Sequence, residues 1–156
     1  MKSFFATLVL FAAALSAACG STDADVAAAQ GLAGRIVPGY ASKIRFEKLT
    51  PAADSADQFE LETVGRKLVV RGNNANSMAV GLNHFLKYYA RANVSWFADQ
   101  PVEVPAQMPQ VAEKVAHRAL LDDRFFLNYC TFGYTMVWWQ WRDWERLIDW
   151  MALNGV

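Results

Sequence analysis

Asn128 is the residue of this sequence whose chemistry is hardest to explain by packing alone. It lies within residues 125–130, a short apolar and aromatic run that predicts a buried strand. A buried amide left without hydrogen bonds costs about 1–3 kcal/mol, so Asn128 requires partners. Two interpretations stay open: the amide ties neighbouring strands together, or it contacts hydroxyl groups of a ligand where the strand ends.

Cys130 closes the same run. A free cysteine is usually a small buried hydrophobe, which is the first interpretation. The second is that Cys130 lines a pocket at the end of the strand. We do not expect a nucleophile, because no histidine lies nearby in the sequence to activate the thiol.

The acidic residues do not form a catalytic pair in this sequence. Glu145 and Asp149 are four residues apart on a predicted helix, where a solvated charged face is the better interpretation. Asp122 and Asp123 precede the predicted strand, and adjacent residues of an extended strand point to opposite faces. We therefore predict no catalytic residue among them.

Metal, cofactor and nucleic-acid chemistry are not indicated. His84 and His117 are more than thirty residues apart and have no cysteine or carboxylate cluster at ligand spacing, so we expect no metal site. The sequence implies no cofactor. The formal net charge is zero, and nucleic-acid binding requires a basic patch, so no nucleic-acid partner is expected.

Residues 141–153 predict the amphipathic helix that follows the strand. With the strand and the connecting loop, this helix makes one β/α unit, and Gly155 ends it. Off its apolar face, Arg142 can pair with Glu145 and Arg146 with Asp149. The apolar face itself recurs at spacings of three and four and consists of Trp141, Trp144, Leu147, Ile148 and Met151.

Five of the six tryptophans lie within residues 125–156. Trp141, Trp144 and Trp150 have core spacing on the helix, so packing is the better interpretation for them than sugar stacking. Trp138 and Trp139 precede the helix and could face either way.

The preceding residues, 31–113, predict a small α/β domain. Strands are expected at 44–49, 58–63, 67–72 and 94–97, with a hairpin around Gly65. A helix capped at Asn73 and Asn74 precedes the last of these strands. The order β-β-β-α-β predicts one helix layer on a sheet, and a proline-containing linker places the domain boundary near Glu113.

The N-terminus predicts export. Residues 1–18 combine one positive charge, a short charge-free run and small residues, which is typical of a signal peptide. Cys19 follows Ala18 as in a lipobox, although Ser16 stands where an aliphatic residue is usual; ordinary cleavage after Ala18 is the alternative. We expect a bacterial cell-envelope lipoprotein. Residues 19–30 form its tether. Residues 27–33 predict a short helix stopped by Gly34.

Several separated motifs occur together in this sequence. They are residues 35–38, 57–59, 81–89, 94–96, 127–131, 134–136, 139, 144–145 and 148–155. In this combination they resemble the α-N-acetylglucosaminidases of glycoside hydrolase family 89. The resemblance covers roughly residues 31–156.

The resemblance implies a small N-terminal α/β sandwich domain followed, in residues 114–156, by the truncated start of a TIM (β/α)8 barrel. It implies an exo-acting retaining hydrolase of terminal, non-reducing α-linked N-acetylglucosamine. The two catalytic glutamates of that family lie on later barrel strands, so this fragment alone is expected to be inactive. Asn128 and Cys130 match residues of the sugar pocket, and Tyr134 is a weaker candidate.

One alternative belongs to a different class. A lipid-anchored, non-catalytic module could bind glycans or a protein through the tryptophan-rich end, because exposed aromatic surface marks a binding site or an absent partner.

Overall fold

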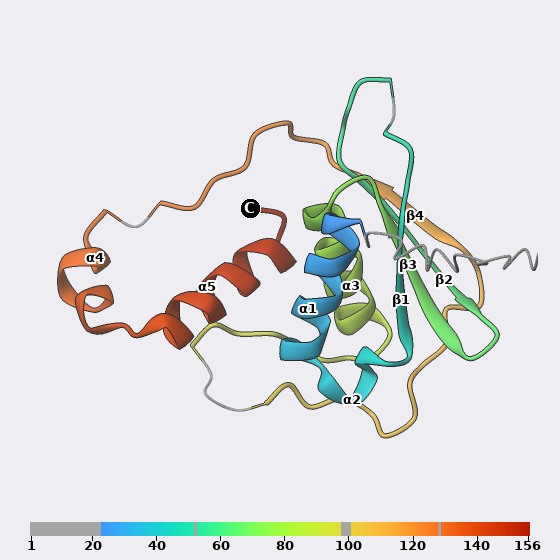
Figure 1. Cartoon of the computed structure of the whole chain (residues 1–156), viewed down its shortest axis with the longest axis horizontal. Coiled ribbons are helices and arrows are strands. Elements are labelled where there is room, and N and C mark those ends of the chain that lie inside the picture. Colours follow the sequence, from blue (N-terminus) through green and yellow to red (C-terminus); the bar gives the residue numbers. More distant parts are fainter. Residues whose placement is uncertain (1–22, 52, 98–100, 128) are drawn as a thin grey trace, which may run out of the picture.

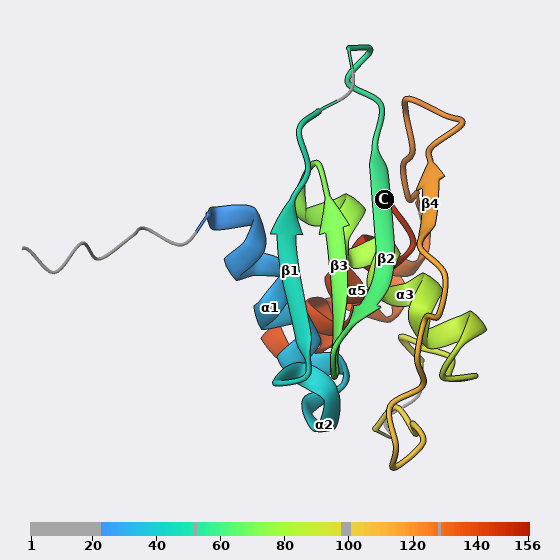
Figure 2. The same cartoon turned by 90° about the vertical axis from the view of Figure 1, so that its right-hand side faces the viewer.

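The computed structural model describes residues 23–51, 53–97, 101–127 and 129–156. The strands of this part form a four-stranded sheet in the order β1-β3-β2-β4 (Figure 2). β1 runs parallel to β3, and β2 is antiparallel to both β3 and β4. The strands are β1 (Ile44–Lys48), β2 (Gln58–Val64), β3 (Lys67–Gly72) and β4 (Val115–Arg118).

Alternating apolar residues explain why the first three strands form. Phe46, Leu61 and Val70 are buried on one face of the sheet, where strand alternation places every second side chain. β2 and β3 are joined by a tight turn in which Gly65 has a φ of +64°. Glycine adopts this left-handed conformation without steric cost. The antiparallel pairing of β2 with β3 confirms the predicted hairpin.

The opposite face of the sheet is charged. Arg71 lies 2.7 Å from Glu47 and 2.5 Å from Glu62, and Arg45 lies 2.9 Å from Glu47. The side chains of these pairs are partly exposed, so this face is a solvent-facing surface and not a second core. Ion pairs of this kind contribute about 0–1 kcal/mol each.

A layer of helices covers the apolar face of the sheet (Figures 1 and 2). α1 (Ala24–Ile36) and α3 (Ala75–Tyr88) pack against the strands, and α2 (Pro38–Ala41) joins α1 to β1. The predicted α/β class, with helices on a sheet, is confirmed.

Two features of the sequence fix α3. Asn74 caps it, because its side-chain oxygen accepts a hydrogen bond from the amide of Ser77 at 2.7 Å. Gly81 allows a close approach to the sheet: a Cβ there would lie 2.9 Å from Cγ1 of Val70. The helix predicted after Asn73 and Asn74 is confirmed.

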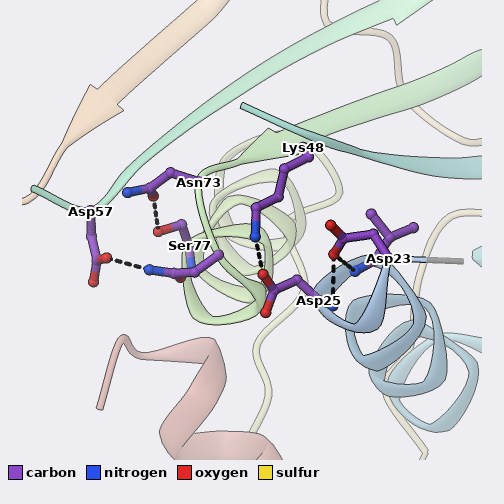
Figure 3. Close-up of polar contacts among 8 residues, drawn as sticks. Asp23, Asp25, Lys48, Asp57, Asn73 and Ser77 are labelled. Carbon is purple, nitrogen blue, oxygen red and sulfur yellow. Dashed lines mark hydrogen bonds and ion pairs between the residues drawn. The ribbon is translucent and has the colours of Figure 1, made fainter. Parts of the chain in front are cut away.

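Polar contacts tie α1 and α3 to their surroundings (Figure 3). Asp23 caps α1 by accepting a hydrogen bond from the amide of Asp25 at 2.9 Å. Asp25 in turn forms an ion pair with Lys48 of β1. At the start of α3, the hydroxyl of Ser77 donates to Oδ1 of Asn73 at 2.7 Å, so these largely buried polar groups are satisfied.

The C-terminal part of the chain adds a third layer. α5 (Trp141–Leu153) lies against α3 on the side away from the sheet (Figure 1). α4 (Thr131–Tyr134) and the 3₁₀ helix η1 (Met136–Trp138) precede it. Leu153 is fully buried and belongs to the same core as the strands, so α5 is docked on the small domain.

The strand predicted at residues 94–97 is wrong. There the chain bends, and the hydroxyl of Ser95 accepts a hydrogen bond from the amide of Phe97 at 3.2 Å. The fourth strand is β4, which pairs with β2 so that Val115 lies opposite Leu61. The sheet therefore continues past Glu113, where we placed the domain boundary.

Two further expectations need correction. Residues 125–127 and 129–130 form no strand, and Phe125 and Leu127 are exposed. A barrel strand needs neighbouring strands for its hydrogen bonds, and the described residues offer none beside it. α1 continues past Gly34 to Ile36, since a glycine near a helix end only weakens the helix.

The predicted signal peptide at residues 1–18, the lipidation site Cys19 and the candidate Asn128 lie outside the described residues. Within the residues that are described, no helix is both long enough and apolar enough to cross a bilayer.

Candidate substrate-binding site

Cys130 and Tyr134 lie within one turn of each other. α4 starts directly after Cys130, and the amide of Gly133 donates to the Cys130 carbonyl at 3.2 Å. The Cys130 thiol is free and exposed, and 77% of Tyr134 is exposed. The structure therefore shows a surface thiol and a surface phenol four residues apart, and not the buried hydrophobe of our first interpretation of Cys130.

The tryptophans next to this segment divide into two groups. Trp139 packs edge-on against Trp144 of α5, with ring centroids 5.0 Å apart, and against Trp96 at 5.9 Å. Trp138 and Trp141 are instead 79% and 68% exposed. Core spacing therefore predicted the environment of Trp144 correctly but not that of Trp141, which lies at the first residue of α5.

The exposed aromatic residues flank the candidate residues in the sequence. Monomeric proteins rarely expose this many large apolar side chains without a ligand or an interface. The set comprises Phe125, Tyr129, Tyr134, Trp138 and Trp141.

Asp149 does not lie on a solvated helix face, contrary to our expectation. It is only 4% exposed, and the guanidinium of Arg35 donates to both of its carboxylate oxygens, at 2.7 and 2.6 Å. These hydrogen bonds raise the pKa of Arg35 above its ordinary value, with Glu145 at 3.8 Å adding to the effect. A carboxylate engaged in this way is not free to attack or protonate a substrate.

Two other contacts hold the C-terminal segment to the small domain. Arg124 forms an ion pair with Asp57, whose other oxygen accepts a hydrogen bond from Asn74 at 2.6 Å. The buried amide of Asn83 donates to the carbonyl of Leu153 at 2.7 Å. Sequence reasoning missed both, because each joins residues that are far apart in the chain and carry no local pattern.

A groove of about 860 Å³ runs between the end of α1 and α5. Its walls include the side chains of Arg35 and Arg91 from the small domain and Arg142 and Glu145 from α5. The Arg35–Asp149 pair bridges this groove.

The fold brings His84 and His117 together. Their rings are 4.7 Å apart, beside Phe59 and Tyr88. Burial lowers the pKa of His84, and the charge of His117 lowers it further. Among the described residues, no group of three or more His, Cys, Asp or Glu side chains is placed to hold a metal ion.

Comparisons with known proteins match both parts of the chain. Residues 27–110 match the family model for the α-N-acetylglucosaminidase (NAGLU) N-terminal domain. Residues 124–156 match the model for the TIM-barrel domain of the same enzymes. The two matches follow each other in the order that the fold shows.

Individual relatives agree with these matches. Human α-N-acetylglucosaminidase is 34% identical over 152 residues, which is 95% of this chain but 20% of that protein. A family 89 glycoside hydrolase from Clostridium perfringens, in complex with 2-acetamido-1,2-dideoxynojirmycin, is 33% identical with a TM-score of 0.78. A substituted variant of the C. perfringens enzyme, in complex with its substrate GlcNAc-α-1,4-galactose, is 32% identical with a TM-score of 0.77.

The chain covers only part of these proteins. The C. perfringens structures match 85% of this chain and 15% of theirs, so the chain spans about one fifth or less of each relative's length. What matches is the N-terminal domain and the start of the barrel. By its sequence and its fold, the chain belongs to the α-N-acetylglucosaminidase family, glycoside hydrolase family 89.

Proposed function

We propose that this chain is the N-terminal part of an exo-acting, retaining α-N-acetylglucosaminidase. The observation that carries the proposal is the consecutive match of residues 27–110 and 124–156 to the two domains of one enzyme family. The substrate class is a glycan that ends in non-reducing α-linked N-acetylglucosamine, in keeping with the substrate complex of the C. perfringens relative. The stand-alone binding module finds no comparable support.

The chemistry requires residues beyond those in this chain. A retaining hydrolase needs a nucleophilic carboxylate and an acid/base carboxylate about 5–5.5 Å apart across the glycosidic bond. Asp149 of α5 is bound by Arg35 through both carboxylate oxygens. Asp122 and Asp123 are exposed and adjacent in an irregular segment. The resemblance to family 89 implies that the catalytic glutamates lie on later strands of the barrel.

This chain would contribute one wall of the sugar pocket through Asn128, Cys130 and Tyr134. The exposure of Cys130 and Tyr134 supports the proposal, because pocket residues must be accessible to the ligand. Side-chain amides and phenols donate and accept hydrogen bonds, which suits recognition of sugar hydroxyl groups.

The proposed enzyme is exported and anchored by lipid at Cys19. The support is the charge-free run that ends in Ala17-Ala18-Cys19-Gly20. Mass spectrometry of the mature N-terminus tests it: a lipidated Cys19 agrees with the proposal, and an unmodified or uncleaved N-terminus contradicts it.

Asn128→Ala in the enzyme that carries the whole barrel tests the pocket role. We expect kcat/KM on an aryl α-N-acetylglucosaminide to fall about 10- to 100-fold, because a site built to bind a hydroxyl loses that partner. The melting temperature should change little. The matched control is Asn93→Ala, an exposed asparagine of the small domain that should leave both quantities unchanged. Equal proportional losses of activity and stability would instead assign Asn128 a structural role.

A further inference from the structure

The helix α5 has two faces with different surroundings. On one face Leu147 and Leu153 are buried, and Leu153 belongs to the core of the small domain. On the other face Trp141 and Ile148 are 68% and 45% exposed. α5 is therefore docked on the small domain through Leu153 and also contacts Trp139 through Trp144, while Trp141 and Ile148 remain exposed.

The contact that fixes its orientation is the pair formed by Arg35 and Asp149. Nε and one terminal nitrogen of Arg35 each donate to a different oxygen of Asp149, at 2.7 and 2.6 Å. Two parallel hydrogen bonds between planar groups define direction as well as distance. A single contact such as that of Asn83 with the Leu153 carbonyl fixes only one end of the helix.

The two partners differ in burial, so removing Arg35 and removing Asp149 have different consequences. The Asp149 side chain is 6% exposed, whereas the Arg35 side chain is 43% exposed. Without Arg35, a carboxylate that is 6% exposed would lose both of its charged hydrogen bonds, and the cost of leaving it unpaired would favour movement of α5 towards the groove. Without Asp149, Arg35 would simply turn towards water in the adjoining groove.

We propose that Arg35, a residue of the small domain, is a positioning residue for the start of the barrel. It holds α5, and through α5 it sets the place of the segment from Cys130 to Tyr134 that leads into the helix. The effect on the sugar pocket rests on the proposed function, whereas the docking of α5 does not.

Hydrogen exchange in the 156-residue chain measures the docking directly. In Arg35→Met we expect the amides of residues 147–153 to exchange at least about 30-fold faster, because a buried charge has lost its partner. The amides of α3 and β3 should keep their protection. Arg35→Lys should lie between wild type and Arg35→Met, since lysine cannot form the two-bonded fork.

The double variant Arg35→Met, Asp149→Leu makes the test specific. Removing both charges should bring exchange in α5 back to within about threefold of wild type, because no carboxylate is left unpaired. The control is Arg45→Met, which breaks an exposed pair on the far face of the sheet and should leave α5 unchanged. If Arg35→Met fails to fold, Asp149→Asn provides the same comparison with a smaller expected effect of about threefold to tenfold.

Two results would overturn the proposal. One is unchanged exchange of residues 147–153 in both Arg35→Met and Asp149→Asn. The other is an equal acceleration throughout α3, β3 and α5, which would mean a general loss of stability. In the enzyme with the whole barrel, Arg35→Met should raise KM more than it lowers kcat; if that enzyme is inactive, the proposed function fails while the exchange result still decides the docking.

Discussion

Asp149 illustrates how burial decides the role of a single side chain. Its spacing from Glu145 predicted a solvated face, and an i,i+3 partner was available in Arg146. The fold instead buries the carboxylate and gives it Arg35, 114 residues away in the sequence. A pattern read within one helix could not have identified this partner, because the ion pair exists only after α1 and α5 are brought together.

His84 gives a prediction at the same scale. Burial beside Phe59 and the charge of His117 lower the pKa of His84, so the folded protein favours the neutral ring. The stability that depends on this is complete above the ordinary histidine pKa of about 6.5 and is lost as the pH falls below it. The unfolded chain then takes up a proton that the folded chain resists.

The free energy of unfolding of the wild type should fall between pH 7.5 and pH 5.5. We expect this fall to be smaller in His84→Phe. The reduction should be on the order of 0.5 kcal/mol, since solvent screens a partly exposed ring. Urea unfolding at several pH values measures it. Tyr88→Phe is the control, because it changes a neighbouring ring without removing a titrating group. Identical pH slopes for wild type and His84→Phe would show that the fold does not perturb this histidine.

Elements with strong local signals were predictable. The β2–β3 hairpin, α3 with its Asn74 cap and α5 all appear where alternation, capping and helical spacing indicated them. β4 was not foreseen, because its four residues are mostly exposed and its place is set by the free edge of β2. Residues 125–127 and 129–130 form no strand, which shows that apolar sequence alone is not sufficient without strands to pair with.

Glycine positions test the packing of these elements. A Cβ at Gly72 of β3 would lie 2.7 Å from the backbone nitrogen of Met78, whereas a Cβ at Gly34 of α1 would meet nothing within 4 Å. Gly72→Ala should therefore destabilise the chain by about 1–3 kcal/mol, because the start of α3 must shift. Gly34→Ala, the matched control, should stabilise it by about 0.5–1 kcal/mol.

Chemical denaturation of the two alanine variants measures both effects. A Gly72→Ala protein as stable as wild type would mean that the contact between β3 and α3 is looser than the structure shows. A loss in Gly34→Ala would mean that α1 does not extend through residue 34.

At the scale of the whole molecule, the small domain and the start of the barrel are one packed body. α5 shares its core with the sheet through Leu153, and Arg124 and Arg35 tie the two parts by ion pairs. A single β/α unit cannot bury its own apolar face, so the apolar face of α5 needs a partner. The structure shows that the small domain buries part of that face, while Trp138 and Trp141 remain exposed.

We propose that this chain carries one wall of the sugar pocket of a glycosidase but not the catalytic pair of carboxylates. Incubation with an aryl α-N-acetylglucosaminide, for the purified 156-residue chain and for the same chain followed by the remainder of its barrel, tests this most directly. We predict no turnover above background by the short chain and retaining hydrolysis by the longer one, because only the longer one has two carboxylates across the bond. Turnover by the short chain that disappears in the double variant Asp122→Asn, Asp123→Asn would contradict the account.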